Sequence, residues 1–263
     1  EGSLPRGAGA RALRAGRGRV TPLRRAAIRA IQPLTAARAA RLCPQRVIFF
    51  HIPKTAGSTV NAHFKGLLGS SWRGQALTIS DASGPEELAL ARGARYVGGH
   101  YGTAQLDHLG PGLRVTVLRD PMDRLVSAWR YQQTLKRPLP FETLEQALAS
   151  GHPRVARLFD NAQARRLASP TGASDVPRET WLSGAKSTLS GFDVVLRQSN
   201  FDAEFRSFLK RLGLTAPERI GRANATGSIG QRPPPPMPDR AALASLAEPF
   251  IAIDRALLDS VSA

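Results

Sequence analysis

A strand, a turn of small residues and a helix, over residues 46–59, constrain the fold of this chain more than any other stretch. Val47 to Ile52 form an apolar, β-favouring run that is too short for a helix and long enough for a buried strand. Pro53 ends the run because it has no N–H for a strand ladder. Apolar residues then recur at helical spacing, at Val60, Phe64, Leu67 and Leu68. Ser58 or Thr59 is the expected N-cap of this helix.

The turn between this strand and this helix has the composition of an anion site. Its residues are Lys54, Thr55, Ala56, Gly57, Ser58 and Thr59. A helix N-terminus directs free N–H groups and the positive end of the helix dipole at one point. Lys54 adds a full charge and the hydroxyls add donors, which suits a phosphate. The turn is not a Walker A loop, because Lys54 precedes Gly57. The alternative is an ordinary β–α turn with a surface lysine.

A second strand–helix unit lies at residues 113–130. Val115 to Leu118 read as a buried strand, and Arg119 stands at its end. Asp120–Pro121 is typical of a helix start, with Asp as the N-cap and Pro at the first helical position. Ser127 falls about a turn and a half into that helix. We therefore expect Arg119 and Ser127 to hold one anion between them.

A histidine between these two units is the candidate base. A short strand at 95–98 ends in two glycines, and His100 follows them. Ligands of open parallel sheets gather at the carboxyl ends of the strands, and glycine lets the backbone approach a bound group closely. The alternative is a strand-end histidine that only hydrogen-bonds. His51, beside the first turn, is interpreted as structural.

Three segments in register resemble a known enzyme family. His-Ile-Pro-Lys-Thr-Ala-Gly-Ser-Thr, from residue 51, resembles the 5′-phosphosulfate loop of sulfotransferases that use 3′-phosphoadenosine 5′-phosphosulfate (PAPS). Arg-Asp-Pro-Met-Asp-Arg-Leu-Val-Ser-Ala-Trp, from residue 119, resembles their 3′-phosphate segment. With the Gly-His segment between them, they are similar in order and spacing to the heparan sulfate 2-O-sulfotransferase-like branch. The resemblance covers roughly residues 46–260.

The resemblance implies a fold and a division of the chain. We expect an α/β, three-layer, P-loop-kinase-like domain with a mainly parallel central sheet, because strands and helices alternate. The predicted strands are 46–52, 95–98, 114–118 and 192–196. Residues 69–93 read as a loop and a short helix, and 202–212 as an amphipathic helix. Asp239 is expected to cap a C-terminal helical segment that is interrupted at Pro249.

The resemblance also implies roles for single residues. The 5′-phosphosulfate would be bound by Lys54, Thr55, Ala56, Gly57, Ser58 and Thr59. Lys54 would neutralise the leaving oxygen, and His100 would take the acceptor's proton. The 3′-phosphate would be bound by Arg119 and Ser127. Asn161 and Gln163 lie in a segment similar to an acceptor-side motif of the branch, although Ala164 replaces its threonine. No metal is required, since lysine and arginine supply the positive charge. Arg222 to Gly227 resemble a loop that covers the nucleotide.

Composition bounds the partners of the protein. The chain has 263 residues and a formal net charge of +17, which implies an anionic partner. Its one cysteine, Cys43, excludes an internal disulfide framework and a cysteine-based zinc site. We expect PAPS and a hydroxyl acceptor as partners, with a glycan as one candidate acceptor, and no specific nucleic acid. The alternatives are a P-loop-like kinase or NTPase and a non-catalytic polyanion-binding protein. The oligomeric state is left open.

The N-terminal 46 residues contain eleven arginines against one acid. We divide the chain into a basic, partly disordered arm at 1–45 and a sulfotransferase domain at 46–263. Within the arm, 22–42 is expected to form a basic helix with one apolar face made of Leu23, Ala27, Ile31 and Leu34. A solvated tail, an arm for an acidic substrate or membrane, and a transit peptide are the three interpretations. No apolar run reaches the ~20 residues of a membrane span, and we expect a cytoplasmic protein, with a lost leader or anchor as the alternative.

Overall fold

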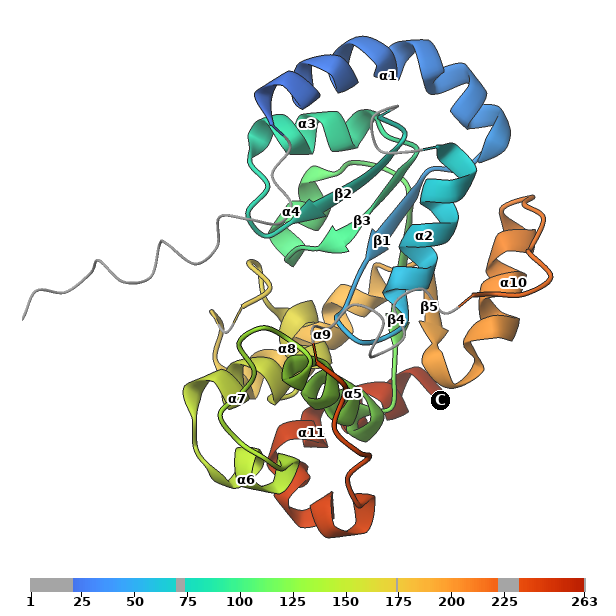
Figure 1. The fold of residues 1–263 in the computed structure, drawn as a ribbon. Coiled ribbons are helices and arrows are strands. Elements are labelled where there is room, and N and C mark those ends of the chain that lie inside the picture. The colour runs from blue at the N-terminus through green and yellow to red at the C-terminus, as the bar shows by residue number, and fades with distance from the viewer. Residues whose placement is uncertain (1–20, 70–73, 174, 222–231, 263) are drawn as a thin grey trace, which may run out of the picture.

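A five-stranded parallel sheet forms the centre of the molecule (Figure 1). The computed structural model describes residues 21–69, 74–173, 175–221 and 232–262. The strand order is β2-β3-β1-β4-β5, and every pair is parallel. The strands are β1 (Val47–Phe50), β2 (Ala76–Ser80), β3 (Tyr96–His100), β4 (Leu113–Leu118) and β5 (Val194–Arg197). The order places β1 in the middle, with the ends of β3 and β4 beside it, so the three predicted site segments share one edge of the sheet.

Helices cover both faces of the sheet, which confirms the predicted three-layer α/β fold. One face packs on α2 (Gly57–Leu68) and α10 (Phe201–Arg211). The other packs on α3 (Pro85–Gly93), α4 (Thr103–His108), α8 (Ala162–Ala168) and α9 (Trp181–Ser190). A third apolar cluster joins α5 (Pro121–Gln133), α6 (Leu144–Ala149), α7 (Pro153–Phe159) and α11 (Arg240–Ser262). Along β1, Ile48 and Phe50 enter one core, while Val47 and Phe49 enter the other.

The sequence missed one strand and two helices. β2 lies in the stretch that was predicted to be loop and short helix. It is an edge strand of five residues whose apolar positions only alternate with Thr78 and Ser80, so it lacks the continuous apolar run of a central strand. The short α4 and the helix α9 were also not predicted. None of the helices in the described ranges combines the length and the hydropathy that a membrane span requires.

The basic helix α1 (Pro22–Leu42) exists, but its buried face is not the predicted one. Leu23 and Leu34 are 86% and 83% exposed, whereas Ile28 is fully buried in the core. Gln32 is also buried, and its amide donates to the carbonyls of Gly74 and Leu90 at 2.7 and 2.9 Å. These contacts attach 22–42 to the domain, although the division at residue 45 itself stays a prediction. The predicted disorder before residue 20 and the loop 222–227 fall outside the described residues.

Candidate functional site

The turn after β1 has a backbone that few sequences adopt. Lys54 and Ala56 have φ angles of 72° and 73°, in the left-handed region that costs a non-glycine residue about 1 kcal/mol or more. Helix α2 begins at Gly57, and Ala56 is its N-cap without a side-chain cap bond. The predicted cap at Ser58 or Thr59 is therefore wrong. Alternating backbone conformations of this kind turn successive N–H groups into one concavity, which is an anion-binding arrangement.

The hydroxyls of the turn are used unequally. Thr55 is fully buried, and its hydroxyl donates to the carbonyl of Ile52 at 2.8 Å. The hydroxyl of Thr59 donates to the carbonyl of Gly221 at 3.2 Å, which ties the start of α2 to the segment that follows α10. Ser58 is half-buried at the second position of α2. The threonines therefore hold the shape of the turn, while backbone N–H groups and Ser58 are the donors suited to a ligand.

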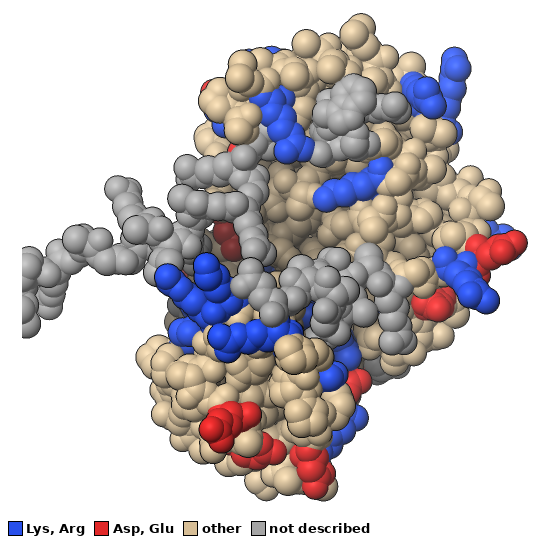
Figure 2. Space-filling view, viewed as in Figure 1, with Lys and Arg blue, Asp and Glu red and all other residues tan. Residues whose placement is uncertain are grey.

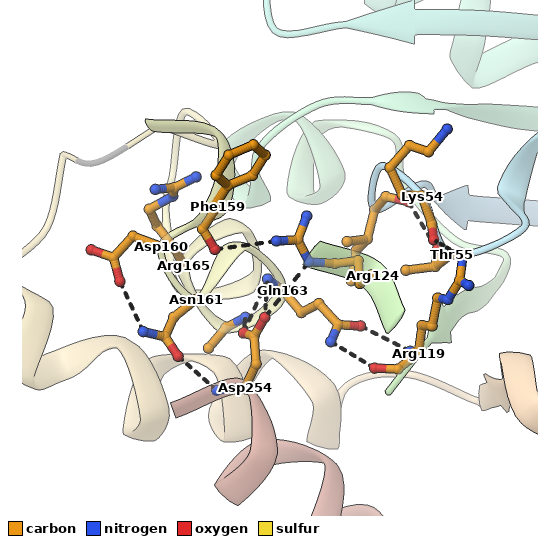
Figure 3. Close-up of polar contacts among 12 residues, drawn as sticks. Lys54, Thr55, Arg119, Arg124, Phe159, Asp160, Asn161, Gln163, Arg165 and Asp254 are labelled. Carbon is orange, nitrogen blue, oxygen red and sulfur yellow. Dashed lines mark hydrogen bonds and ion pairs between the residues drawn. The ribbon is translucent and has the colours of Figure 1, made fainter. Parts of the chain in front are cut away.

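Lys54 and Arg119 meet at the centre of the site (Figure 3). The guanidinium of Arg119 donates to the carbonyl of Lys54 at 3.1 Å, so the two predicted phosphate segments are in direct contact. The ammonium of Lys54 lies 4.3 Å from the centre of the Tyr131 ring on α5. Burial, and to a smaller extent the charge of Arg119, together lower the pKa of Lys54 to about 8.

The start of α5 is formed as predicted. Asp120 is the N-cap, and its carboxylate accepts from the N–H of Asp123 at 2.8 Å, with Pro121 at the first helical position. Ser127 lies half-buried on the same helix. Its pairing with Arg119 around one anion stays a prediction.

His100 is the last residue of β3, and its side chain is exposed at the carboxyl edge of the sheet. Its Nδ1 lies 2.8 Å from the carbonyl oxygen of His51, an acceptor only, so Nδ1 carries the proton and donates it. In neutral His100 the lone pair is then on Nε2, the atom that a general base uses. The protein packed around the ring and the charge of Arg166 together lower the pKa of His100 to about 4, although its bond to the carbonyl of His51 favours the charged ring.

Asn161 and Gln163 lie inside the protein. Asn161 is fully buried, and its side-chain oxygen accepts from the N–H groups of Ile253 and Asp254 at 2.8 and 3.0 Å. Its amide nitrogen donates to the carbonyl of Pro249 at 3.0 Å. Gln163 is buried too, and its amide bonds to the backbone of Arg119. This burial favours structural roles for both residues over the predicted contact with the acceptor.

Three contributors to the site were not predicted from the sequence. Tyr131 supports Lys54 from α5, and Asn61 on α2 contacts His51. The charge of Arg166 on α8 lowers the pKa of His100, and Arg166 forms a salt bridge with Asp81 at 3.0 Å. No motif marks these residues, because each reaches the site only through the packing of its helix. In the part of the chain that the structure describes, no three His, Cys, Asp or Glu side chains are grouped to hold a metal ion.

Basic side chains gather on the face shown in Figure 2. Lys and Arg side chains lie along the lower rim of a hollow between the upper and lower parts of the molecule, an acidic side chain lies inside the hollow, and other acidic side chains lie at the lower end and on the right. This arrangement accords with the excess of positive charge in the sequence and with a site for an anionic ligand.

The fold and the site together define a class of protein. The sheet is parallel with strand order 2-3-1-4-5. It has a lysine-bearing turn after its central strand, β1, and an arginine at the end of β4, which lies beside β1 in the sheet. This is the framework of a P-loop-kinase-like transferase. A family model described as the Sulfotransferase family matches residues 42–228, and the chain belongs to that family. A comparison with curated proteins gave no match. Membership indicates a transferase that moves a sulfuryl group, and it favours this activity over the kinase or NTPase alternative.

Proposed function

We propose that the protein transfers a sulfuryl group from PAPS to an acceptor hydroxyl by in-line attack. The observation that carries this proposal is the contact between Arg119 and Lys54, at 3.1 Å. PAPS carries a phosphosulfate and a separate 3′-phosphate, and two adjoining cationic segments match this pair of anions. ATP carries all its phosphates in one chain, which leaves the second segment without a ligand.

The turn and the Arg119 segment would divide the donor between them. The backbone N–H groups of residues 55–58 and the hydroxyl of Ser58 would hold the 5′-phosphosulfate. The N–H of Thr59 instead donates to the carbonyl of Ala56 at 2.9 Å. Lys54 would neutralise the charge that develops on the leaving phosphate oxygen, as cations do in phosphoryl transfer. Arg119 and Ser127 would hold the 3′-phosphate. These roles need no metal ion.

His100 would act as the base. Its Nε2 takes the proton of the acceptor hydroxyl as the bond from that oxygen to sulfur forms. The bond from sulfur to the 5′-phosphate oxygen breaks, and 3′,5′-adenosine bisphosphate leaves. A positioned base contributes about 10²–10⁴-fold to such a step. The low pKa of His100 keeps the ring neutral and its Nε2 free to accept a proton across the physiological range, and a bound anionic donor would raise its basicity.

The acceptor is proposed more broadly. The order and spacing of the three segments support a place in the heparan sulfate 2-O-sulfotransferase-like branch, and hence a glycan acceptor. The net charge of +17 supports an acidic acceptor.

Nucleotide binding tests the donor assignment. Titration calorimetry should give tight, magnesium-independent binding of 3′,5′-adenosine bisphosphate, and Arg119→Ala should weaken it by roughly 10–100-fold, the equivalent of ~1.5–3 kcal/mol. The affinity for adenosine 5′-monophosphate, which lacks the 3′-phosphate, should fall much less in the same variant. The matched control is Arg38→Ala, on the exposed side of α1. Equal affinity for ATP, or a strict requirement for Mg²⁺, would contradict the assignment. Labelled PAPS offered with a panel of hydroxyl acceptors then tests the transfer.

A further inference from the structure

A chain of hydrogen bonds leads from the interior of the sheet to the proposed base. The hydroxyl of Tyr96 donates to Oδ1 of Asn61 at 2.8 Å. Nδ2 of Asn61 lies 3.2 Å from Nδ1 of His51. Because an amide nitrogen only donates, Nδ1 of His51 accepts and carries no proton, and a neutral His51 then has its proton on Nε2.

Two glycines make room for this chain. A Cβ at Gly98 would lie 2.3 Å from Oδ1 of Asn61 and 2.5 Å from the hydroxyl of Tyr96. A Cβ at Gly57 would lie 2.0 Å from Cδ2 of His51 and 2.3 Å from its Nε2. Real Cβ atoms do not approach neighbours this closely, so both positions require glycine for the present packing. Gly98 thus serves the Asn61–Tyr96 bond, and Gly57 seats the His51 ring against the phosphate turn.

The His51 ring lies directly beside that of His100. Their centroids are 4.1 Å apart, and the carbonyl of His51 accepts the Nδ1 proton of His100. The charged and titratable groups that face His51 are His100, Arg166 and Lys54, and with burial they hold its pKa well below the usual value. A positive charge on His51 would repel any proton that His100 has to accept, so the base needs a neutral neighbour.

We infer that Asn61 and Tyr96 are positioning residues of the reaction, which hold His51 as the neutral Nε2–H tautomer beside His100. This inference rests on the proposed function, because it assigns these hydrogen bonds a role in supporting the base of that reaction. An amide at position 61 suits the task and a carboxylate does not. A carboxylate would accept a proton from Nδ1 of His51 and favour the charged imidazolium.

The test replaces Asn61 by Asp. Long-range ¹H–¹⁵N NMR, with the five histidines assigned by single substitutions, should show His51 of the wild type protonated on Nε2 alone at neutral pH. In Asn61→Asp the Nδ1 of His51 should be protonated and donate to the carboxylate. Turnover should fall about 10–100-fold, the effect of a misplaced catalytic group, while affinity for 3′,5′-adenosine bisphosphate stays within about threefold. Gln45→Glu makes the same amide-to-acid change at an exposed residue before β1 and should leave all three readings at wild type.

A second variant covers the case in which Asn61→Asp fails to fold. Tyr96→Phe keeps the buried ring that stacks on Phe64 at 4.5 Å and removes only the donor to Asn61. Its His51 should exchange between tautomers, and its turnover should fall with unchanged nucleotide affinity. His51 protonated on Nδ1 in the wild type, or a changed tautomer with full turnover, overturns the inference. Since the tautomer is read without substrate, this failure is distinct from a wild-type protein that transfers nothing from PAPS.

Discussion

Gln163 holds the backbone of Arg119 through both atoms of its side-chain amide. Its Oε1 accepts the N–H of Arg119 at 2.9 Å, and its Nε2 donates to the carbonyl of the same residue at 2.8 Å. The amide thereby satisfies both backbone groups at the point where β4 ends and fixes the direction in which the Arg119 side chain leaves the sheet. Gln163 in turn is held by Asp254 of α11, whose carboxylate accepts its N–H at 3.1 Å (Figure 3).

Gln163→Leu should therefore affect both stability and nucleotide preference. Loss of the amide leaves two partly buried backbone groups without this partner, at about 1–3 kcal/mol of unfolding free energy. With Arg119 free to shift, the ratio of affinities for 3′,5′-adenosine bisphosphate and adenosine 5′-monophosphate should fall by about tenfold or more. Urea unfolding and calorimetry measure the two effects.

Gln32→Leu is the matched control for this substitution. Gln32 is also a buried glutamine that bonds to backbone carbonyls, but it joins α1 to the loop before β2 and to α3. The Gln32→Leu variant should be less stable, but its ratio of affinities for the two nucleotides should not change. An unchanged ratio in Gln163→Leu would mean that Arg119 is positioned without the amide.

Asn161 bonds to the backbone of helix α11 around Pro249. Pro249 lies inside this helix and has no N–H for the helical ladder. Asn161 accepts from the N–H of Ile253 and donates to the carbonyl of Pro249. Asn161→Ala should thus lower the unfolding free energy by roughly 2–4 kcal/mol, through unpaired amides and a left-handed alanine. Asn161→Asp keeps the acceptor but replaces the donor to the Asp160 carboxylate, 2.8 Å away, by a second buried carboxylate, so it should lose at least as much in urea unfolding at neutral pH. A raised acceptor KM at unchanged stability would instead restore the predicted substrate contact.

Helix α1 should contribute to stability through its inner face alone. Ile28→Ala removes a fully buried side chain and should cost about 2–5 kcal/mol in urea unfolding. Leu34→Ala, on the outer face, should change stability by less than about 0.5 kcal/mol. Removal of residues 1–40 should then destabilise the domain, contrary to what the sequence alone indicates. A stable, nucleotide-binding protein without these residues would show that the helix contacts are dispensable.

How much the sequence could predict follows from where each signal resides. β1 is a central strand with a continuous apolar run, so it was found. β4 has Thr116 among its apolar residues but is marked by the Asp-Pro helix start that follows it, while the edge strand β2 has only alternation. Lys54 and His100 stand in local motifs that chain order reveals. The predicted buried face of α1 was wrong because tertiary contacts bury the polar Gln32 and leave the apolar Leu34 exposed, which hydrophobicity alone does not predict.

The candidate site follows the same rule. The anion turn was predicted from composition, but its cap was not, since a left-handed Ala56 replaces a hydroxyl cap and leaves Thr59 to bond Gly221. Tyr131 and Asn61 act through contacts between elements that no sequence spacing encodes. Asn161 was assigned to the acceptor by motif similarity, and only the break at Pro249 shows a use for its amide inside the protein.

Proton uptake on nucleotide binding should reveal the state of Lys54. Its pKa in the free protein is lowered to about 8, first by burial and then by Arg119, so part of it is neutral above that pH. A bound anion favours the charged ammonium and raises this pKa, so binding takes up a proton and affinity falls as the pH rises through about 8. Calorimetry of 3′,5′-adenosine bisphosphate at about pH 8.5, in buffers of different ionisation enthalpy, should show uptake approaching about one proton.

Lys54→Arg should abolish the uptake, because a guanidinium is charged throughout this range. Uptake that persists in Lys54→Arg would assign the proton to another group, and no uptake in the wild type would contradict the lowered pKa.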